Sequence, residues 1–287
     1  MQQALSDSAA LPRPTSLSEV KGWFHSPDQV LFDWFLSRQR QRGQTGDLLE
    51  IGAYLGKSAI FMGRHLRPGE LFTVCDLFDS PAGDEANSAE MNRSYATLTR
   101  RAFEANYLAF HEELPAVVQG PSSVITEHVE PGTCRFIHVD GSHLYEHVHA
   151  DIAAAKELIA PDGILVLDDF RAEHCPGVAA ATWGAVATTG LRPLCITATK
   201  FYGTWGAYDE VHADLAELLA GRKDMWHGAE IVAGDPMIRI DGRKAKLPEQ
   251  PVSRHKATAS AASASAASSS EVPQPRTRGL KALFARR

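Results

Sequence analysis

The feature that most constrains this sequence is an alternation of short apolar segments with helical segments between residues 47 and 170. Five apolar segments are short enough to be strands, and each is closed by glycine, aspartate or a turn. These strands are predicted at residues 47–52, 71–76, 116–120, 134–140 and 163–170. Because they are almost continuously apolar, both faces must be covered, which predicts an α/β fold with a mainly parallel sheet and helices on both faces.

Helices are predicted between these strands and at both flanks, at residues 57–66, 96–110, 145–159 and 208–219. Pro161 to Gly163 is expected to be the turn into the fifth strand. Ahead of the first strand, Ser26 is a helix cap, Pro27 lies in the first turn, and Gly43 ends the helix. The pattern is weaker near the C-terminus, where strands are expected at residues 191–197, 200–205 and 237–241.

Both ends of the chain differ in composition from the middle. Residues 1–15 are expected to be flexible, residues 16–247 to form the folded domain with an N-terminal helical extension, and residues 248–287 to be a disordered Ala/Ser-rich basic tail. From Arg254 onward, seven Lys and Arg residues oppose one Glu. The net charge of −6, less the tail's +6, leaves −12 on the rest. An acidic body disfavours a nucleic-acid-binding surface.

The cysteines and the apolar segments predict the cellular setting. The four cysteines are widely spaced and form no C-x-x-C pair, which favours a reducing, cytoplasmic compartment. No secretory signal is apparent, and no apolar stretch approaches the roughly 20 residues that span a bilayer, so no stable membrane association is expected. A homo-oligomer is possible, because Trp34 and Phe35 can pack within the monomer or against a second subunit.

Ligands of open α/β sheets bind beyond the carboxyl ends of the strands, so the residues that close each strand are the candidate site residues. The first strand runs into a loop with Gly52 and Gly56 in a G-x-x-x-G pattern, followed by a helix whose first N–H groups are unpaired. This spacing differs from the G-x-G-x-x-G of dinucleotide-binding proteins. A ligand-binding loop and a structural turn both fit it.

Polar residues also close the second and third strands. Asp76 can accept hydrogen bonds from both hydroxyls of a ribose or act as a turn residue, and the glycine loop about 20 residues earlier favours the ribose. Ser122 and Ser123 can contact an adenine or cap the next helix, and both interpretations stay open. The polar segment 79–93 is expected to be a loop or lid.

The strongest signal is acidic, because Asp140 closes the fourth strand and Asp168 and Asp169 close the fifth. If these strands are neighbours, three carboxylates converge, and they repel one another unless a cation, protons or basic groups compensate. Hard oxygen ligands suit Mg²⁺, Mn²⁺ or Ca²⁺. We therefore predict a metal site at these three residues, with helix capping as the alternative.

Histidines surround the same segment. His143 lies three residues beyond Asp140 and can deprotonate a substrate hydroxyl, although a cap or surface role also fits. His147 and His149 are expected to be solvated helix residues, and His138 a core residue.

The segments LLEIGAYLGKS, FIHVDGSHLYEHVHADI and PDGILVLDDF resemble class I S-adenosylmethionine-dependent methyltransferases of the macrocin O-methyltransferase-like group, methyltransferase family 24. The resemblance covers roughly residues 47–170. It implies a Rossmann-like fold and transfer of a methyl group to a hydroxyl of a small molecule of sugar, polyketide or phenol type. Alternatives are a cephalosporin hydroxylase-like oxidoreductase on the same fold and a non-catalytic protein that binds S-adenosylmethionine.

The resemblance also implies residue roles. S-adenosylmethionine would be held by residues of the glycine loop and the strand ends: Glu50, Gly52, Ala53, Tyr54, Gly56, Ser58, Asp76, Ser122 and Asp140. Asp140, Asp168 and Asp169 match the carboxylates that hold a divalent ion, expected to be Mg²⁺, in metal-dependent members. Catechol-type enzymes have a lysine where this chain has His143, so the base is either His143 or Asp140. The resemblance does not extend beyond residue 172, and the aromatic residues Trp183, Tyr202, Trp205 and Tyr208 are either acceptor-pocket or core residues.

Overall fold

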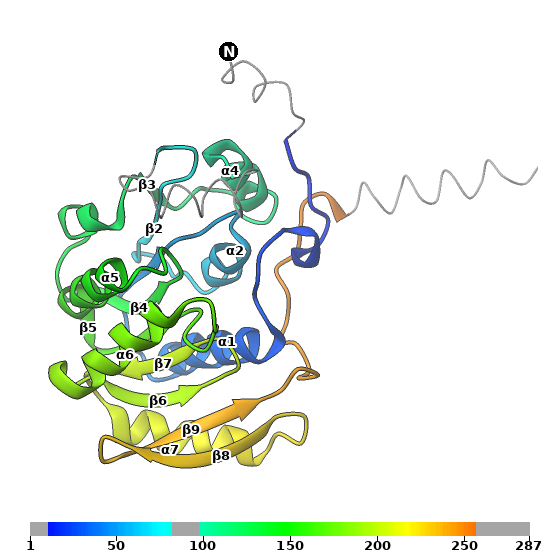
Figure 1. Ribbon diagram of the computed structural model, residues 1–287. Helices are drawn as coiled ribbons and strands as arrows, with labels where there is room; N and C mark the ends of the chain where they lie inside the picture. The colour runs from blue at the N-terminus through cyan, green and yellow to red at the C-terminus, as the bar shows by residue number, and fades with distance from the viewer. Residues whose placement is uncertain (1–10, 82–97, 257–287) are drawn as a thin grey trace, which may run out of the picture.

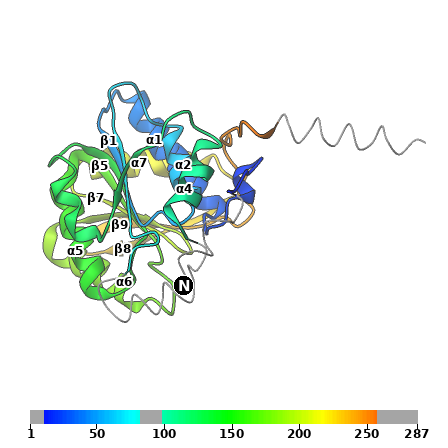
Figure 2. The same cartoon turned by 90° about the horizontal axis from the view of Figure 1, so that it is seen from above.

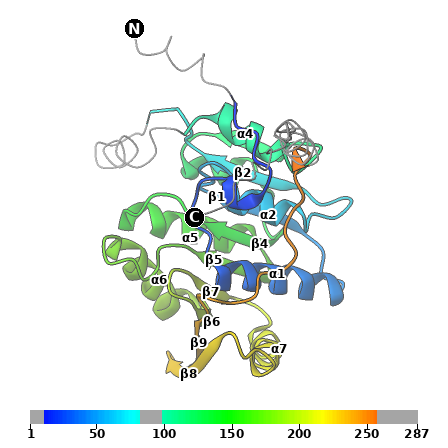
Figure 3. The same cartoon turned by 90° about the vertical axis from the view of Figure 1, so that its right-hand side faces the viewer.

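Nine strands form one sheet in the computed structural model, which describes residues 11–81 and 98–256 (Figure 1). The strands are β1 (Asp47–Ile51), β2 (Phe72–Asp76), β3 (Ala116–Gln119), β4 (Cys134–Val139), β5 (Ile159–Leu167), β6 (Arg192–Ile196), β7 (Phe201–Thr204), β8 (Trp226–Val232) and β9 (Asp235–Asp241). Their order is β3-β2-β1-β4-β5-β7-β6-β9-β8, which Figure 3 shows from β2 at the top to β8 at the bottom. The first five strands pair in parallel, whereas β7 is antiparallel to β5 and β6.

Helices cover both faces of the sheet, as the apolar strands predicted (Figure 2). One face packs against α1 (Ser26–Gln41), α2 (Lys57–Gly63), α4 (Arg100–Leu108) and α7 (Tyr208–Ala220). The other face packs against α5 (Tyr145–Leu158), α6 (Pro176–Thr189) and the short 3₁₀ helix η2 (Ser122–Glu127). A second 3₁₀ helix, η1 (Leu17–Glu19), precedes α1. The predicted fold class is confirmed.

The strand predictions are confirmed, with one correction at β5. Pro161 to Gly163, expected to be a turn, instead lie inside this strand. They are the extra residues of a bulge in β5: Cys134 of β4 pairs with Ile159, but the next paired residue of β4, Phe136, pairs with Ile164. The α1 prediction also needs a small correction: the N-cap is His25, and Ser26 is the first helical residue.

Two elements were not predicted. Helix α6 consists mostly of alanine, glycine, threonine and valine, so its sequence lacks a clear polar face. Strand β8 is largely exposed and forms a hairpin with β9 at the sheet edge, so its apolar residues do not alternate cleanly. These elements extend the molecule beyond the region of the family resemblance.

Some of the segments predicted from the sequence lie wholly or partly outside the described residues. The predicted loop or lid at residues 79–93 lies outside the described residues except for 79–81, as do residues 96–97 of the helix predicted at 96–110. Within the segment predicted to be a tail, the Ser253 hydroxyl donates to the Pro14 carbonyl at 2.6 Å, and the Arg254 N–H donates to the Ala109 carbonyl at 2.8 Å. Residues 248–256 therefore lie against the folded body.

No helix of the described ranges is long and apolar enough to cross a membrane.

Candidate active site

A cavity of about 710 Å³ opens at the carboxyl ends of β1, β2, β4 and β5, where ligands of open α/β sheets bind. Most of the residues predicted from the sequence line it: Gly52, Ala53, Tyr54, Ser58, Asp76, Ser122, Ser123, Asp140, His143, Asp168 and Asp169. Glu50 and Gly56 are not among the lining residues. Gly56 instead begins α2 with a φ of +90°, and Glu50 is fully buried beneath the cavity.

The loop after β1 requires glycine at position 52. Its φ is +79°, and an added Cβ would lie 2.0 Å from the carbonyl oxygen of Asp140. The loop therefore packs directly against the end of β4, where the Asp140 N–H donates to the Ile51 carbonyl at 2.7 Å. This contact places the glycine loop beside the first of the predicted acidic residues.

Asp76 holds the same loop in place. One carboxylate oxygen, Oδ2, accepts hydrogen bonds from the N–H groups of Ala53 and Tyr54 at 2.7 and 2.9 Å, and Oδ1 accepts from Phe78 at 2.7 Å. The pKa of Asp76 is raised, because burial outweighs the lowering effect of these three hydrogen bonds. Since a carboxylate oxygen can accept two bonds, Oδ1 keeps capacity for a ligand hydroxyl.

The serines after β3 do not cap a helix through their side chains. The N-cap of η2 is Pro121, and Ser122 is its first helical residue. The Ser122 hydroxyl is instead hydrogen-bonded to Asp151 of α5, whose pKa burial raises to about 6. Ser122 and Ser123 both line the cavity, which leaves the ligand-contact interpretation in place.

The three predicted carboxylates meet at one edge of the sheet. Strands β4 and β5 pair in parallel with Val139 opposite Leu167, so Asp140 and Asp168 emerge side by side and share a hydrogen bond. Asp169 has a φ of +53°, and its Oδ2 lies 3.0 Å from Nε2 of His143. The convergence predicted from the sequence is confirmed.

A buried ammonium that the sequence analysis missed lies against this cluster. Lys200, immediately before β7, is 1% exposed, and its Nζ forms an ion pair with Oδ2 of Asp168. Nζ also lies 2.9 Å from Nε2 of His138, whose Nδ1 lies 2.7 Å from Oε1 of Glu50. Because an ammonium only donates, Nε2 of His138 must accept, and its Nδ1 carries the proton donated to Glu50. His138 is buried as predicted, but as part of a polar chain.

Charge and burial shift the pKa values of this cluster in opposite directions. Burial, reinforced by neighbouring Asp168, raises the pKa of Asp140 well above its usual range. Burial would also raise the pKa of Asp168, but the charge and the hydrogen bond of Lys200 outweigh it and lower that pKa. Burial and Lys200 lower the pKa of His138, and burial raises that of Glu50 to about 8. The two carboxyl groups of this buried pair therefore differ, with the pKa of Asp140 raised and that of Asp168 lowered.

Other residues at the cavity differ from expectation. His147 lies on α5, is partly exposed and lines the cavity, with Nδ1 2.9 Å from the Ser142 hydroxyl, whereas His149 is exposed as expected. His174 also lines the cavity, and one potential ligand atom each from His143, His174 and Cys175 lies within 4.8 Å of the others.

The aromatic residues considered for the acceptor lie elsewhere. Tyr202 and Tyr208 are buried in the core, Trp183 and Trp205 pack against it, and none of the four lines the cavity. The cavity instead has Trp23, which is 62% exposed, with Tyr54 stacked on it at a ring-centroid distance of 5.8 Å. Trp23 lies far from the strand ends in sequence, so the strand pattern could not indicate it.

Residues 49–170 match the model of the Methyltransf_24 family, described as a methyltransferase domain. The matched region contains the glycine loop, Asp76 and all three cluster carboxylates. This region of the chain is therefore a methyltransferase domain. Lys200 and the elements from α6 onward lie outside the matched region.

Solved structures of similar fold include O-methyltransferases. NovP is 17% identical, with 62% of this chain and 79% of NovP covered and a TM-score of 0.52. CalS11, a TDP-rhamnose 3'-O-methyltransferase, is 15% identical, with coverage of 71% and 92% and a TM-score of 0.45. PaMTH1 of Podospora anserina, bound to S-adenosylhomocysteine, is 14% identical, with coverage of 72% and 94% and a TM-score of 0.46. The NovP match shows a shared fold. No curated protein matches this sequence significantly.

Proposed function

We propose that this methyltransferase transfers the methyl group of S-adenosylmethionine to a hydroxyl of a small molecule, assisted by a divalent cation. One observation carries the proposal: a single cavity joins the glycine loop of β1 to three carboxylates and a histidine at the ends of β4 and β5. A volume of about 710 Å³ lies within the usual range for small-molecule sites and leaves space for an acceptor beside the donor.

The donor would lie against β1 and β2. Gly52, Ala53 and Tyr54 line this part of the cavity, and the missing side chain of Gly52 lets their loop pack against Asp140. Asp76 would accept a ribose hydroxyl through the remaining capacity of Oδ1, and Ser122 and Ser123 lie where the base would be expected.

The carboxylate cluster fits a divalent ion by chemistry and by charge. Asp140, Asp168 and Asp169 offer hard oxygen donors, which Mg²⁺ and Mn²⁺ prefer. Three carboxylates carry −3 when ionised and Lys200 contributes only +1, so negative charge remains for a divalent cation to compensate. The raised pKa of Asp140 supports this fit, because a proton compensates there when no cation does. A bound divalent ion would lower the pKa of the acceptor hydroxyl.

His143 is the residue that we propose as the base. Its Nε2 lies 3.0 Å from Asp169, which can orient the imidazole and stabilise its protonated form. The pKa of Asp140, the alternative base, is raised by burial and by neighbouring Asp168. Once the hydroxyl is deprotonated, alignment of its oxygen with the sulfonium methyl in the same cavity can contribute up to roughly 7–11 kcal/mol to lowering the barrier.

We further propose a cytoplasmic protein that acts on a small molecule, without nucleic-acid binding and with a possible homo-oligomeric state. The four cysteines are buried and none of them is in a disulfide, which agrees with a reducing compartment. Phe35 is buried inside the monomer, whereas Trp34 is only partly buried against the same core. Trp34 is therefore the residue to examine at a subunit interface.

Calorimetric titration of the full chain with S-adenosylhomocysteine, S-adenosylmethionine and NAD⁺ tests the donor assignment. Tight binding of the first two without NAD⁺ binding is expected. NAD⁺ binding alone would support the oxidoreductase alternative. A labelled-methyl assay over a panel of sugars, polyketides and phenols then separates an enzyme from a non-catalytic binding protein.

A further inference from the structure

Lys200 is held in a fixed position by a tight turn between β6 and β7. Its N–H donates to the Thr197 hydroxyl at 2.9 Å, and its carbonyl accepts from the Thr197 N–H at 2.9 Å. The side chain then runs inward and is almost completely buried. Lysine is rarely buried without partners that compensate its charge, so its contacts define its role.

Acidic and basic partners face this ammonium from three elements. Asp168 at the end of β5 forms the ion pair, and His138 of β4 accepts a hydrogen bond. Asp28 of α1 adds a further carboxyl, which also accepts hydrogen bonds from the Thr197 and Tyr202 hydroxyls, each at 2.8 Å. The charges of Asp168, Asp140 and Asp28 outweigh burial and raise the pKa of Lys200, which keeps it cationic.

We propose that Lys200 is a positioning residue that acts as a built-in cation of the carboxylate cluster: it fixes Asp168 in the metal-free protein and weakens the binding of the divalent ion. The proposal rests on the metal site of the proposed function. An ammonium and a metal ion would both compensate the same buried carboxylates, and their like charges repel at short distance. Lys200 thus stabilises the carboxylate cluster in the metal-free protein and lowers the affinity of the cluster for the divalent ion.

Replacement of Lys200 by an uncharged residue of similar length tests this role. In Lys200→Met, Asp168 loses its ion pair, so the variant should melt at a lower temperature than the wild type in chelator. Mn²⁺ should then raise its melting temperature by more than it raises that of the wild type. The dissociation constant for Mn²⁺, measured by calorimetry, should fall by about tenfold or more, the effect of one nearby charge on a neighbouring equilibrium.

Arg135→Met is the matched control. Arg135 is also a buried cation (2% exposed), and it forms an ion pair with Glu70 at the opposite end of the same sheet. This variant should also melt early, but with an unchanged Mn²⁺ affinity and an unchanged shift of its melting temperature by Mn²⁺. A gain in Mn²⁺ affinity common to both variants would overturn the proposal, because general loosening would explain it.

Lys200→Gln, whose amide can still donate to Asp168 and His138, provides the same test if the methionine variant fails to fold. Mn²⁺ affinity equal to or weaker than that of the wild type in the folded variant overturns the role of Lys200. If the wild type binds no Mn²⁺ but the variant does, the role of Lys200 stands and metal assistance in the native enzyme fails. Titration with S-adenosylhomocysteine separately reports whether the donor site is intact.

Discussion

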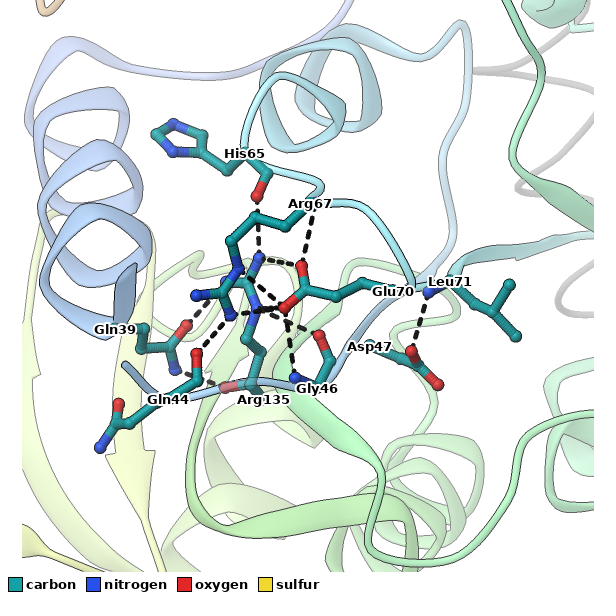
Figure 4. Close-up of polar contacts among 9 residues, drawn as sticks. All are labelled: Gln39, Gln44, Gly46, Asp47, His65, Arg67, Glu70, Leu71 and Arg135. Carbon is teal, nitrogen blue, oxygen red and sulfur yellow. Dashed lines mark hydrogen bonds and ion pairs between the residues drawn. The ribbon is translucent and has the colours of Figure 1, made fainter. Parts of the chain in front are cut away.

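Two buried ionic clusters lie at opposite ends of the same sheet, and they are built differently. At the amino ends of the strands, Arg135 donates to Glu70, to the Gln39 side chain and to backbone carbonyls, and Arg67 donates to Glu70 from the other side (Figure 4). At the carboxyl ends, three carboxylates lie together at a cavity, and Lys200 forms an ion pair with one of them, Asp168.

The difference lies in how completely each cluster is satisfied. The guanidinium of Arg135 has acceptors for its donor groups, and the pKa of Glu70 is lowered because the bonds and charges of Arg135 and Arg67 outweigh burial. The carboxyl-end cluster instead keeps a surplus of negative charge and a raised pKa at Asp140. A cluster whose charges are paired within the protein stabilises the fold. A cluster with unpaired negative charge beside a cavity is suited to bind a cation or to take part in a reaction.

The largest effect is expected at the unbalanced cluster. Asp168→Asn should lower methyl transfer by at least about 100-fold, because it removes a proposed metal ligand. Binding of S-adenosylhomocysteine should be retained, since the donor lies against β1 and β2. Turnover assays with and without chelator, together with calorimetry, check both expectations. Normal turnover in this variant would contradict the metal role of the cluster.

His143→Ala should lower turnover by about 100- to 10,000-fold, the usual contribution of a general base. Donor affinity and melting temperature should change little, because His143 lies at the cavity and is partly exposed. Initial rates at saturating donor measure the effect. Retained turnover would indicate that Asp140, and not His143, is the base.

At the satisfied cluster, a mutation should affect stability rather than chemistry. Arg135→Met should lower the free energy of unfolding by about 3–5 kcal/mol, because one partner of a buried pair is removed. Denaturant titration measures this loss, and titration with S-adenosylhomocysteine measures donor affinity, which should stay unchanged. A loss of donor affinity in the folded variant would break the distinction between the two clusters.

The last prediction concerns Glu50, which is buried next to His138 of the carboxyl-end cluster. Its pKa is raised to about 8 by burial, so the folded protein holds a proton that the unfolded chain releases above its ordinary pKa of 4.5. This carboxyl therefore contributes a stability that is lost as the pH rises from about 4.5 to 8. Glu50→Gln does not titrate, so its melting temperature should rise relative to the wild type across that interval. A constant difference between the two proteins would contradict the shift.

The sequence predicted the acidic part of the site because each acid directly follows an apolar strand. Asp140, Asp168 and Asp169 needed only the rule that parallel strands end at one edge. The glycine loop was predictable for the same reason, and its close contact with Asp140 explains why glycine stands at position 52.

Lys200 could not be found in this way. Its proximity to Asp168 depends on β7 lying antiparallel beside β5, with β6 on its far side, and neither the order nor the direction of these strands follows from local periodicity. A signal was present, since Lys200 begins an otherwise apolar strand candidate, but a lysine at a strand end usually lies in solvent. His174 and Trp23 likewise reach the cavity through tertiary packing.

The most direct measurement is an anomalous-difference map from crystals grown with Mn²⁺ and S-adenosylhomocysteine. The central claim predicts an Mn²⁺ peak bound by Asp140, Asp168 and Asp169, with the sulfur of the bound product facing it in the same cavity. An Mn²⁺ peak remote from these three carboxylates, or a product bound outside the glycine loop, would contradict it.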